Sequence, residues 1–149
     1  KNLINNDSTD ELLSSGGAAE ARYITKKVTL ADGFDASNIV VSFDANKPAG
    51  SNIKVYYRTL PGNVTTSLDD VDWVEMEIEN GVPIQTSLDQ DDYREHRFFP
   101  PSAFDQYGVP IDEPISPRFK TFAIKIVMLS SNPAIVPRVR DLRVIALDS

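Results

Sequence analysis

The sequence predicts an all-β domain, built as an antiparallel β-sandwich of seven or eight strands over residues 21–149. Two observations predict this fold. From Tyr23 onward, apolar and polar residues alternate in short runs that end at Gly, Pro, Asn or Asp. After residue 20, no 11-residue window carries the helical apolar spacing i, i+3, i+4, i+7 without a proline. Strands with one apolar and one polar face can bury the apolar face between two antiparallel sheets packed face to face, which is a β-sandwich. A closed barrel is the alternative.

Residues 1–20 precede this alternation and are predicted to form a linker or a flexible N-terminal arm. The segment is small and polar apart from four large apolar residues, and a Ser-Ser-Gly-Gly run interrupts it at 14–17. Such a composition buries too little apolar surface to offset the entropy lost on ordering. Leu12 and Leu13 leave open a short helix that docks on a neighbour. Because the chain opens on Lys1, we expect it to be a piece of a longer protein.

The first three expected strands cover roughly 22–30, 38–44 and 52–59. Asp32-Gly33 makes the turn after the first, and a Pro-Gly-Asn turn at 61–63 follows the third. Apolar side chains recur at every second position in each run, which is the period of a strand with one buried face. The positions expected to face the core are Ile24, Val28, Leu30, Ile39, Val41, Phe43, Ile53, Val55 and Tyr57.

The fourth expected strand, 73–79, has perfect alternation, with Val74, Met76 and Ile78 facing in and glutamates facing out. The fifth, 93–99, has the weakest pattern, and the Pro-Pro pair after it ends the strand.

Strands six and seven are expected at 119–130 and 138–147. Between the fifth and sixth strands, residues 100–118 hold five prolines and are expected to form a long loop. Loops of this length in a compact domain are usually functional or packed across an open sheet edge. The inward positions of the last two strands are Phe122, Ile124, Ile126, Met128, Leu142, Val144 and Ala146.

Composition excludes several classes of function. The chain has no cysteine and one histidine, His96, so disulfide scaffolds, thiol catalysis and sites with several histidine ligands do not arise. A net charge of −7 argues against nucleic acid or an anionic membrane as the main partner. No apolar run approaches the roughly 18 residues of a membrane span.

Catalytic, metal and cofactor signatures are also lacking, and we expect no enzymatic activity. The aspartate clusters at 69–72 and 89–92 do not fit the spaced calcium-binding loop, and loop solubility explains them more simply. Paired carboxylates suit a glycosidase, but no distinctive motif surrounds any pair. His96 has no nucleophile nearby in sequence and is expected to be a surface or packing residue.

Charge is segregated along the chain. Residues 64–92 carry acids and no Lys or Arg and are expected to form an acidic face, whereas 118–143 carry six basic residues and one acid and are expected to form a basic face. Opposite patches steer and register contacts between copies, although both can equally be solvated faces of a monomer. The candidate subunit contacts are Arg118, Lys120, Arg138, Arg140, Arg143, Asp69, Asp70, Asp72, Glu75 and Glu77.

Aromatic residues in expected loops suggest a second function, carbohydrate recognition. Flat aromatic rings suit the apolar faces of sugars, and β-sandwiches often carry such sites. The candidate glycan contacts are Trp73, Phe104 and Tyr107, with core or loop packing as the alternative use of these residues.

Two regions resemble a β-sandwich module of tailed-bacteriophage virion structural proteins. The opening is ARYITKKVTLADGFDA at 21–36 with NIKVYYR at 52–58, and the close is FKTFAIKIVMLSS at 119–131 with PRVRDLRVIAL at 137–147. The resemblance implies a C-terminal module of a tail, baseplate or neck protein, similar in topology to jelly-roll or discoidin and galactose-binding sandwiches. It further implies a virion location after synthesis in the host cytoplasm, other virion subunits or further copies as partners, and no catalytic residues or cofactor.

Overall fold

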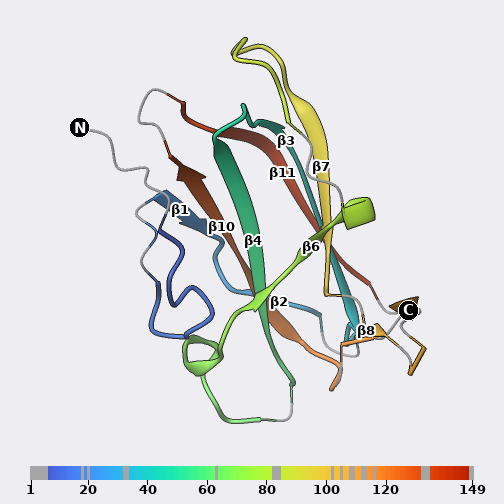
Figure 1. Ribbon diagram of the computed structural model, residues 1–149. Helices are drawn as coiled ribbons and strands as arrows, with labels where there is room; N and C mark the ends of the chain where they lie inside the picture. The colour runs from blue at the N-terminus through green and yellow to red at the C-terminus, as the bar shows by residue number, and fades with distance from the viewer. Residues whose placement is uncertain are drawn as a thin grey trace.

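The computed structural model describes residues 7–17, 19, 21–31, 34–62, 64–81, 85–101, 103–104, 106–107, 110–111, 114–115, 117–131 and 135–147. Two antiparallel sheets of five and four strands pack face to face (Figure 1). The predicted β-sandwich is therefore confirmed. The only helices in the described ranges are two 3-10 turns, η1 (Leu68–Asp70) and η2 (Glu79–Gly81).

The first sheet is built around strand β10, which lies between β1 and β4. The strand order is β1-β10-β4-β5, and β2 also pairs with β10. β10 and β4 pair over their whole lengths, from Thr121 opposite Leu60 to Ser130 opposite Ser51. The strands of this sheet are β1 (Ala21–Ile24), β2 (Val28–Thr29), β4 (Ser51–Leu60), β5 (Val74–Glu75) and β10 (Thr121–Ser130).

The second sheet has the order β11-β3-β7-β6. Its strands are β3 (Asn38–Asn46), β6 (Glu77–Ile78), β7 (Arg94–Phe99) and β11 (Arg138–Leu147). The stretch expected to be an irregular loop, 100–118, instead contains a short hairpin of β8 (Ala103–Phe104) and β9 (Pro110–Ile111). Five of the seven expected strands, those that became β3, β4, β7, β10 and β11, begin and end within two residues of their predicted bounds.

The prediction of one strand over 73–79 is wrong. Glu75 pairs with Tyr56 in the first sheet, whereas Glu77 pairs with Phe99 in the second. The chain crosses from sheet to sheet at Met76, whose side chain is buried. Because the crossing reorients the flanking strands, Val74 is 37% exposed rather than in the core. The expected strand at 22–30 is also divided, into β1 and β2, although both halves pair with β10.

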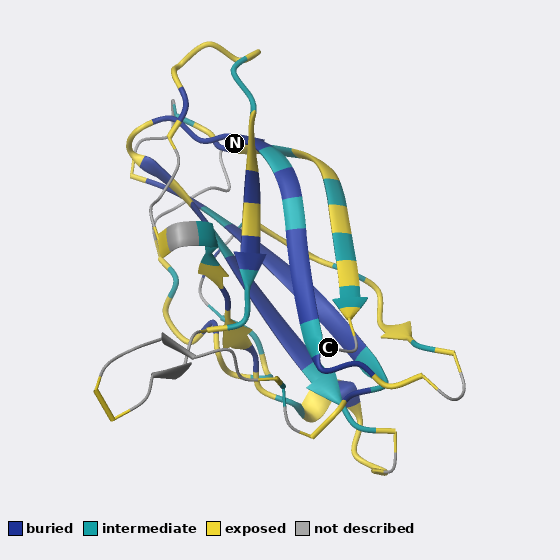
Figure 2. Cartoon of the chain, turned by 90° about the vertical axis from the view of Figure 1, so that its right-hand side faces the viewer, coloured by how far each residue is buried: buried dark blue, intermediate teal, exposed yellow. Residues whose placement is uncertain are grey.

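The main core lies between the two sheets, and Figure 2 shows it as dark blue strands in the middle of the sandwich. It consists of alternate residues from the facing strands, as period-two burial requires. His96 belongs to this core: its ring stacks on Phe43 and its Nδ1 lies 2.9 Å from the Arg94 carbonyl oxygen. The most buried members are Ile39, Val41, Phe43, Val55, Phe119, Ile124 and Ile126.

A second, smaller core covers the outer face of the first sheet. Its members are Ala19, Tyr56, Leu68, Trp73, Ala123, Val127 and Leu129. Described residues of the N-terminal segment form part of it, since Ala19 is buried and the Trp73 amide donates to the Leu12 carbonyl at 2.8 Å. The expectation of an unpacked arm is therefore wrong for these residues. The Glu11 side chain of this segment is also buried, and a count of apolar residues does not predict the burial of a charged residue.

Strand β11 contains a β-bulge. Arg140 lies opposite Asp44 and Arg143 opposite Ser42, so the β11 side of the pairing gains one residue. Asp141 occupies the bulge with a left-handed φ of 57°. The extra residue changes the phase of the strand, so that Arg138 and Arg140 share the outer face with Arg143.

Candidate functional site

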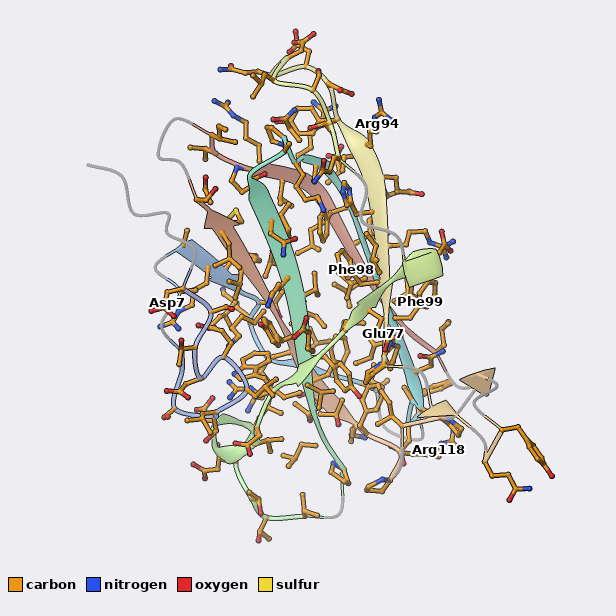
Figure 3. All side chains as sticks on the ribbon, in the orientation of Figure 1. Asp7, Glu77, Arg94, Phe98, Phe99 and Arg118 are labelled. Carbon is orange, nitrogen blue, oxygen red and sulfur yellow. The ribbon has the colours of Figure 1, made fainter. Side chains whose placement is uncertain are left out.

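The five predicted basic contacts do not form one surface. Arg138, Arg140 and Arg143 are exposed on the outer face of β11. Arg118 and Lys120 lie at the other end of the sandwich, where Arg118 donates to the Asp35 carbonyl at 2.9 Å. Figure 3 labels Arg118 near the lower end and Arg94 near the upper end. Since β10 and β11 begin at opposite ends, only the β11 arginines remain a candidate surface.

The acidic segment is likewise divided among several places. Asp69 and Asp70 belong to η1, beside the second core, and the Asp72 carboxylate accepts from the Ser14 amide at 3.1 Å. Glu75 and Glu77 lie on different sheets because the chain crosses between them. The expectation of a single acidic face over 64–92 is therefore wrong, although all five side chains are exposed.

The outer face of the second sheet is a mixed-charge surface rather than a basic one. Arg143 lies 3.2 Å from a Glu95 carboxylate oxygen and 4.0 Å from one of Asp44. The guanidinium carbon of Arg140 is 3.7 Å from the centroid of the Tyr93 ring. These contacts join neighbouring strands β11, β3 and β7, so part of the arginine charge is already neutralised within the chain.

Trp73 is not available to stack on a sugar. It is 3% exposed, and its ring contacts two cations, with Arg58 at 4.3 Å and Lys125 at 5.0 Å from the ring centroid. The prediction that Trp73 contacts a glycan is therefore wrong, because Trp73 lies in the second core, where the arm and η1 cover the outer face of the first sheet. Tyr107 is 81% exposed, and the side chain of Phe104 lies outside the described part of the structure.

A buried ion pair, which sequence reasoning missed, joins the arm to β10. The Lys125 ammonium lies 2.9 Å from the Glu11 carboxylate and also donates to the Glu11 carbonyl at 2.6 Å. The Ala19 amide donates to the second carboxylate oxygen at 2.8 Å. Burial lowers the pKa of Lys125, and the hydrogen bond that its ammonium donates to Glu11 opposes that change. The inward positions Ile124 and Ile126 imply that Lys125 lies on the outer face of the strand, but alternation does not show that the arm covers this face.

A second missed feature is a cleft of about 350 Å³ beside the crossing from β5 to β6. Ile53, Met76, Ile78 and Phe98 form its apolar wall. Lys47 also lines it, although this residue is only 4% exposed. Burial lowers the pKa of Lys47. No sequence signal marks this cleft, because its residues come from four separate segments.

The described residues do not contain a group of three or more His, Asp or Glu side chains placed to hold a metal ion. No helix in the described chain is long and apolar enough to cross a membrane. Searches against protein-family models, curated proteins and solved structures give no match to this chain.

Proposed function

We propose that this chain is a non-enzymatic assembly module of a bacteriophage virion protein, in a tail, baseplate or neck, and that it docks against neighbouring subunits. The observation that carries the proposal is the outer face of β11. This strand forms an edge of the second sheet, since it pairs only with β3 among the described strands. An exposed edge strand is a natural site for association.

The side chains on this face favour a specific contact with one partner surface over unspecific edge-to-edge aggregation. Arg138 and Arg140 are exposed at one end of the strand, and Ile145 and Leu147 are 53% and 40% exposed at the other. Charges and a bulge on an edge strand oppose indiscriminate pairing with other strands. An acidic surface on a neighbouring subunit would complement the arginines and register the contact. A further copy of this chain, which is acidic overall, could provide such a surface.

The virion location is tested by mass spectrometry of purified phage particles from the source. We expect the peptides YITK and TFAIK at a constant, symmetric ratio to the shell subunits. Absence of both peptides from particles that contain the other structural proteins would refute the virion location.

The docking surface is tested by charge reversal in the parent gene. Arg138→Glu with Arg140→Glu is expected to lower the yield of complete particles, counted by electron microscopy, because the arginines would repel an acidic partner surface once reversed. Lys26→Glu with Lys27→Glu is the matched control, since both lysines are exposed in the turn between β1 and β2. Equal yields from the two double variants would remove β11 from the proposal without affecting the virion location.

A further inference from the structure

The cleft at the crossing between the sheets has the composition of a ligand site. It lies beside β4, where β5 pairs only with Tyr56 and Tyr57 and leaves the Ser51–Lys54 part of the strand without a described neighbour on that side. Its volume of about 350 Å³ is at the lower end for small-molecule sites. Five of its ten lining residues carry a charge or an amide, and four others are apolar. The lining therefore suits a small ligand with both polar and apolar faces.

Lys47 is the unusual group in this cleft. The residue is 4% exposed, and its backbone is fixed by reciprocal contacts with Thr86, in which the Lys47 amide donates to Thr86 Oγ1 at 2.8 Å and the Lys47 carbonyl accepts from the Thr86 amide at 3.0 Å. Its ammonium has neither a hydrogen-bond nor an ion-pair partner among the residues that the structure describes, and it is not one of the fully buried side-chain nitrogens, so it keeps some contact with solvent. The rest of the side chain is buried, and an incoming carboxylate would give this ammonium a charge-assisted hydrogen bond.

The other polar groups of the cleft can form hydrogen bonds with hydroxyl groups of a ligand. Asn52 Oδ1 accepts from the Ile53 amide at 2.9 Å, which leaves its amide nitrogen available to donate to a ligand. The carboxylates of Glu75 and Glu77 also line the cleft and are strong acceptors for hydroxyl groups. Figure 3 shows Glu77 beside Phe98 and Phe99, where β6 meets β7. The lining also includes Lys54, whose ammonium lies 3.5 Å from Ser8 Oγ, so the two carboxylates of the cleft balance its two ammoniums and leave no excess positive charge for a ligand with several negative charges.

We propose that this cleft binds a monocarboxylate sugar, such as a uronic acid, with the sugar carboxylate on Lys47, its hydroxyls on Asn52, Glu75 and Glu77, and its apolar face on Met76 and Phe98. A neutral sugar would leave Lys47 unpaired. A fatty acid would bring an apolar chain against the glutamates. The site differs from the aromatic platform expected from the sequence, and it is independent of the proposed docking surface on β11.

The test is a nuclear magnetic resonance titration of the isotope-labelled chain with galacturonate and glucuronate. Galactose, glucose and hexanoate are the comparison ligands, which lack the carboxylate or the hydroxyls. We expect saturable shifts of the Ile53, Met76 and Phe98 amides with at least one uronate. The neutral sugars and hexanoate should bind at least about tenfold more weakly, since a hydrogen bond to a charged group is worth about 1.5–3 kcal/mol.

Variants locate the anion contact. Lys47→Met is expected to weaken uronate binding by about tenfold or more, and Lys47→Arg should retain a cation and most of the affinity. Lys27→Met, which removes an exposed lysine outside the cleft, is the matched control for net charge. The circular dichroism spectrum of each variant checks its fold.

Three results would overturn the proposal. The first is a titration in which neither uronate gives saturable shifts at the cleft. The second is a neutral sugar or hexanoate that binds as tightly as the better uronate. The third is a folded Lys47→Met chain with unchanged uronate affinity. Particle assembly has its own readout, so failure of this site would leave the virion proposal standing.

Discussion

The Glu11–Lys125 pair shows how two charged residues can be accommodated in a protein interior. Both side chains are 1% exposed. The ammonium lies 4.8 Å from the centroid of the Tyr56 ring and 5.0 Å from that of Trp73, and both carboxylate oxygens have hydrogen-bond partners. Removing two charges from water costs several kcal/mol for each ion, which only such complete pairing offsets. The pair therefore fixes one position of the arm on the sheet.

Breaking this pair is expected to be far more damaging than breaking a surface pair. Glu11→Ala should lower the free energy of unfolding by about 3–5 kcal/mol in urea denaturation, because Lys125 is left buried without a counterion. Glu95→Ala is the matched control, since it removes an exposed partner of Arg143 at 3.2 Å and should cost at most about 1 kcal/mol. Similar losses from the two variants would contradict the buried character of the Glu11 site.

At the scale of elements, the bulge in β11 determines which side chains the strand presents. Arg140 and Arg143 are three positions apart, so a regular strand without the bulge at Asp141 would place Arg138 and Arg140 on the face opposite Arg143 and Ile145. The inward positions Val139 and Leu142 would likewise be on opposite faces. One residue with a positive φ thus reconciles two runs of alternation that are out of phase.

Asp141→Val is expected to lower the free energy of unfolding by about 1–3 kcal/mol, because a β-branched residue is strained at the positive φ of the bulge. Asp141→Gly should change stability by less than about 1 kcal/mol, because glycine adopts the positive φ readily. Deletion of Asp141 should be tolerated better than Asp141→Val, since it leaves one regular alternation with the arginines outward and the aliphatic residues inward. An Asp141→Val variant as stable as the wild type would contradict the positive φ at the bulge.

At the scale of the whole molecule, the central strands β4 and β10 of the first sheet are largely buried on both faces, while the second sheet is exposed on one. Figure 2 shows this difference: β11, which ends near the label C, alternates between intermediate and exposed residues, and the strands behind it are continuously buried. The arm and the segment that carries η1 cover the outer face of the first sheet. Consequently the described residues of the N-terminal segment are part of the folded domain, and the outer face of the second sheet stays exposed.

Removal of residues 1–19 is therefore expected to destabilise the whole domain, by at least the roughly 3 kcal/mol assigned to loss of Glu11. The truncated chain should also bind an apolar dye, since Tyr56 and Trp73 lose part of their cover. Removal of residues 1–6 is the control, because it keeps Glu11 and Ala19. If the longer truncation melts at the same temperature as the control, the arm does not contribute to the second core.

Strand positions could be predicted from the sequence because period-two burial is a local property. β3, β4, β10 and β11 each bury enough alternate residues to be recognised by themselves. The segment 73–79 has equally regular alternation, yet its two halves join different sheets. Alternation describes which side chains are apolar and carries no information about which strand is the hydrogen-bond partner.

The sequence by itself determined the fold class, the main strands and most residues of the main core, since these follow from local hydrophobic patterns. Three predicted inward positions are wrong, because Ile24, Val28 and Val74 lie on short strands and are exposed. Only the tertiary structure decided where charges come together. It separated the arginines of β11 from Arg118, buried Trp73 under the arm, paired Glu11 with Lys125 and placed Lys47 in a cleft. The physical reason is that electrostatic partners are chosen by long-range packing, which can bring residues more than a hundred positions apart to within hydrogen-bond distance.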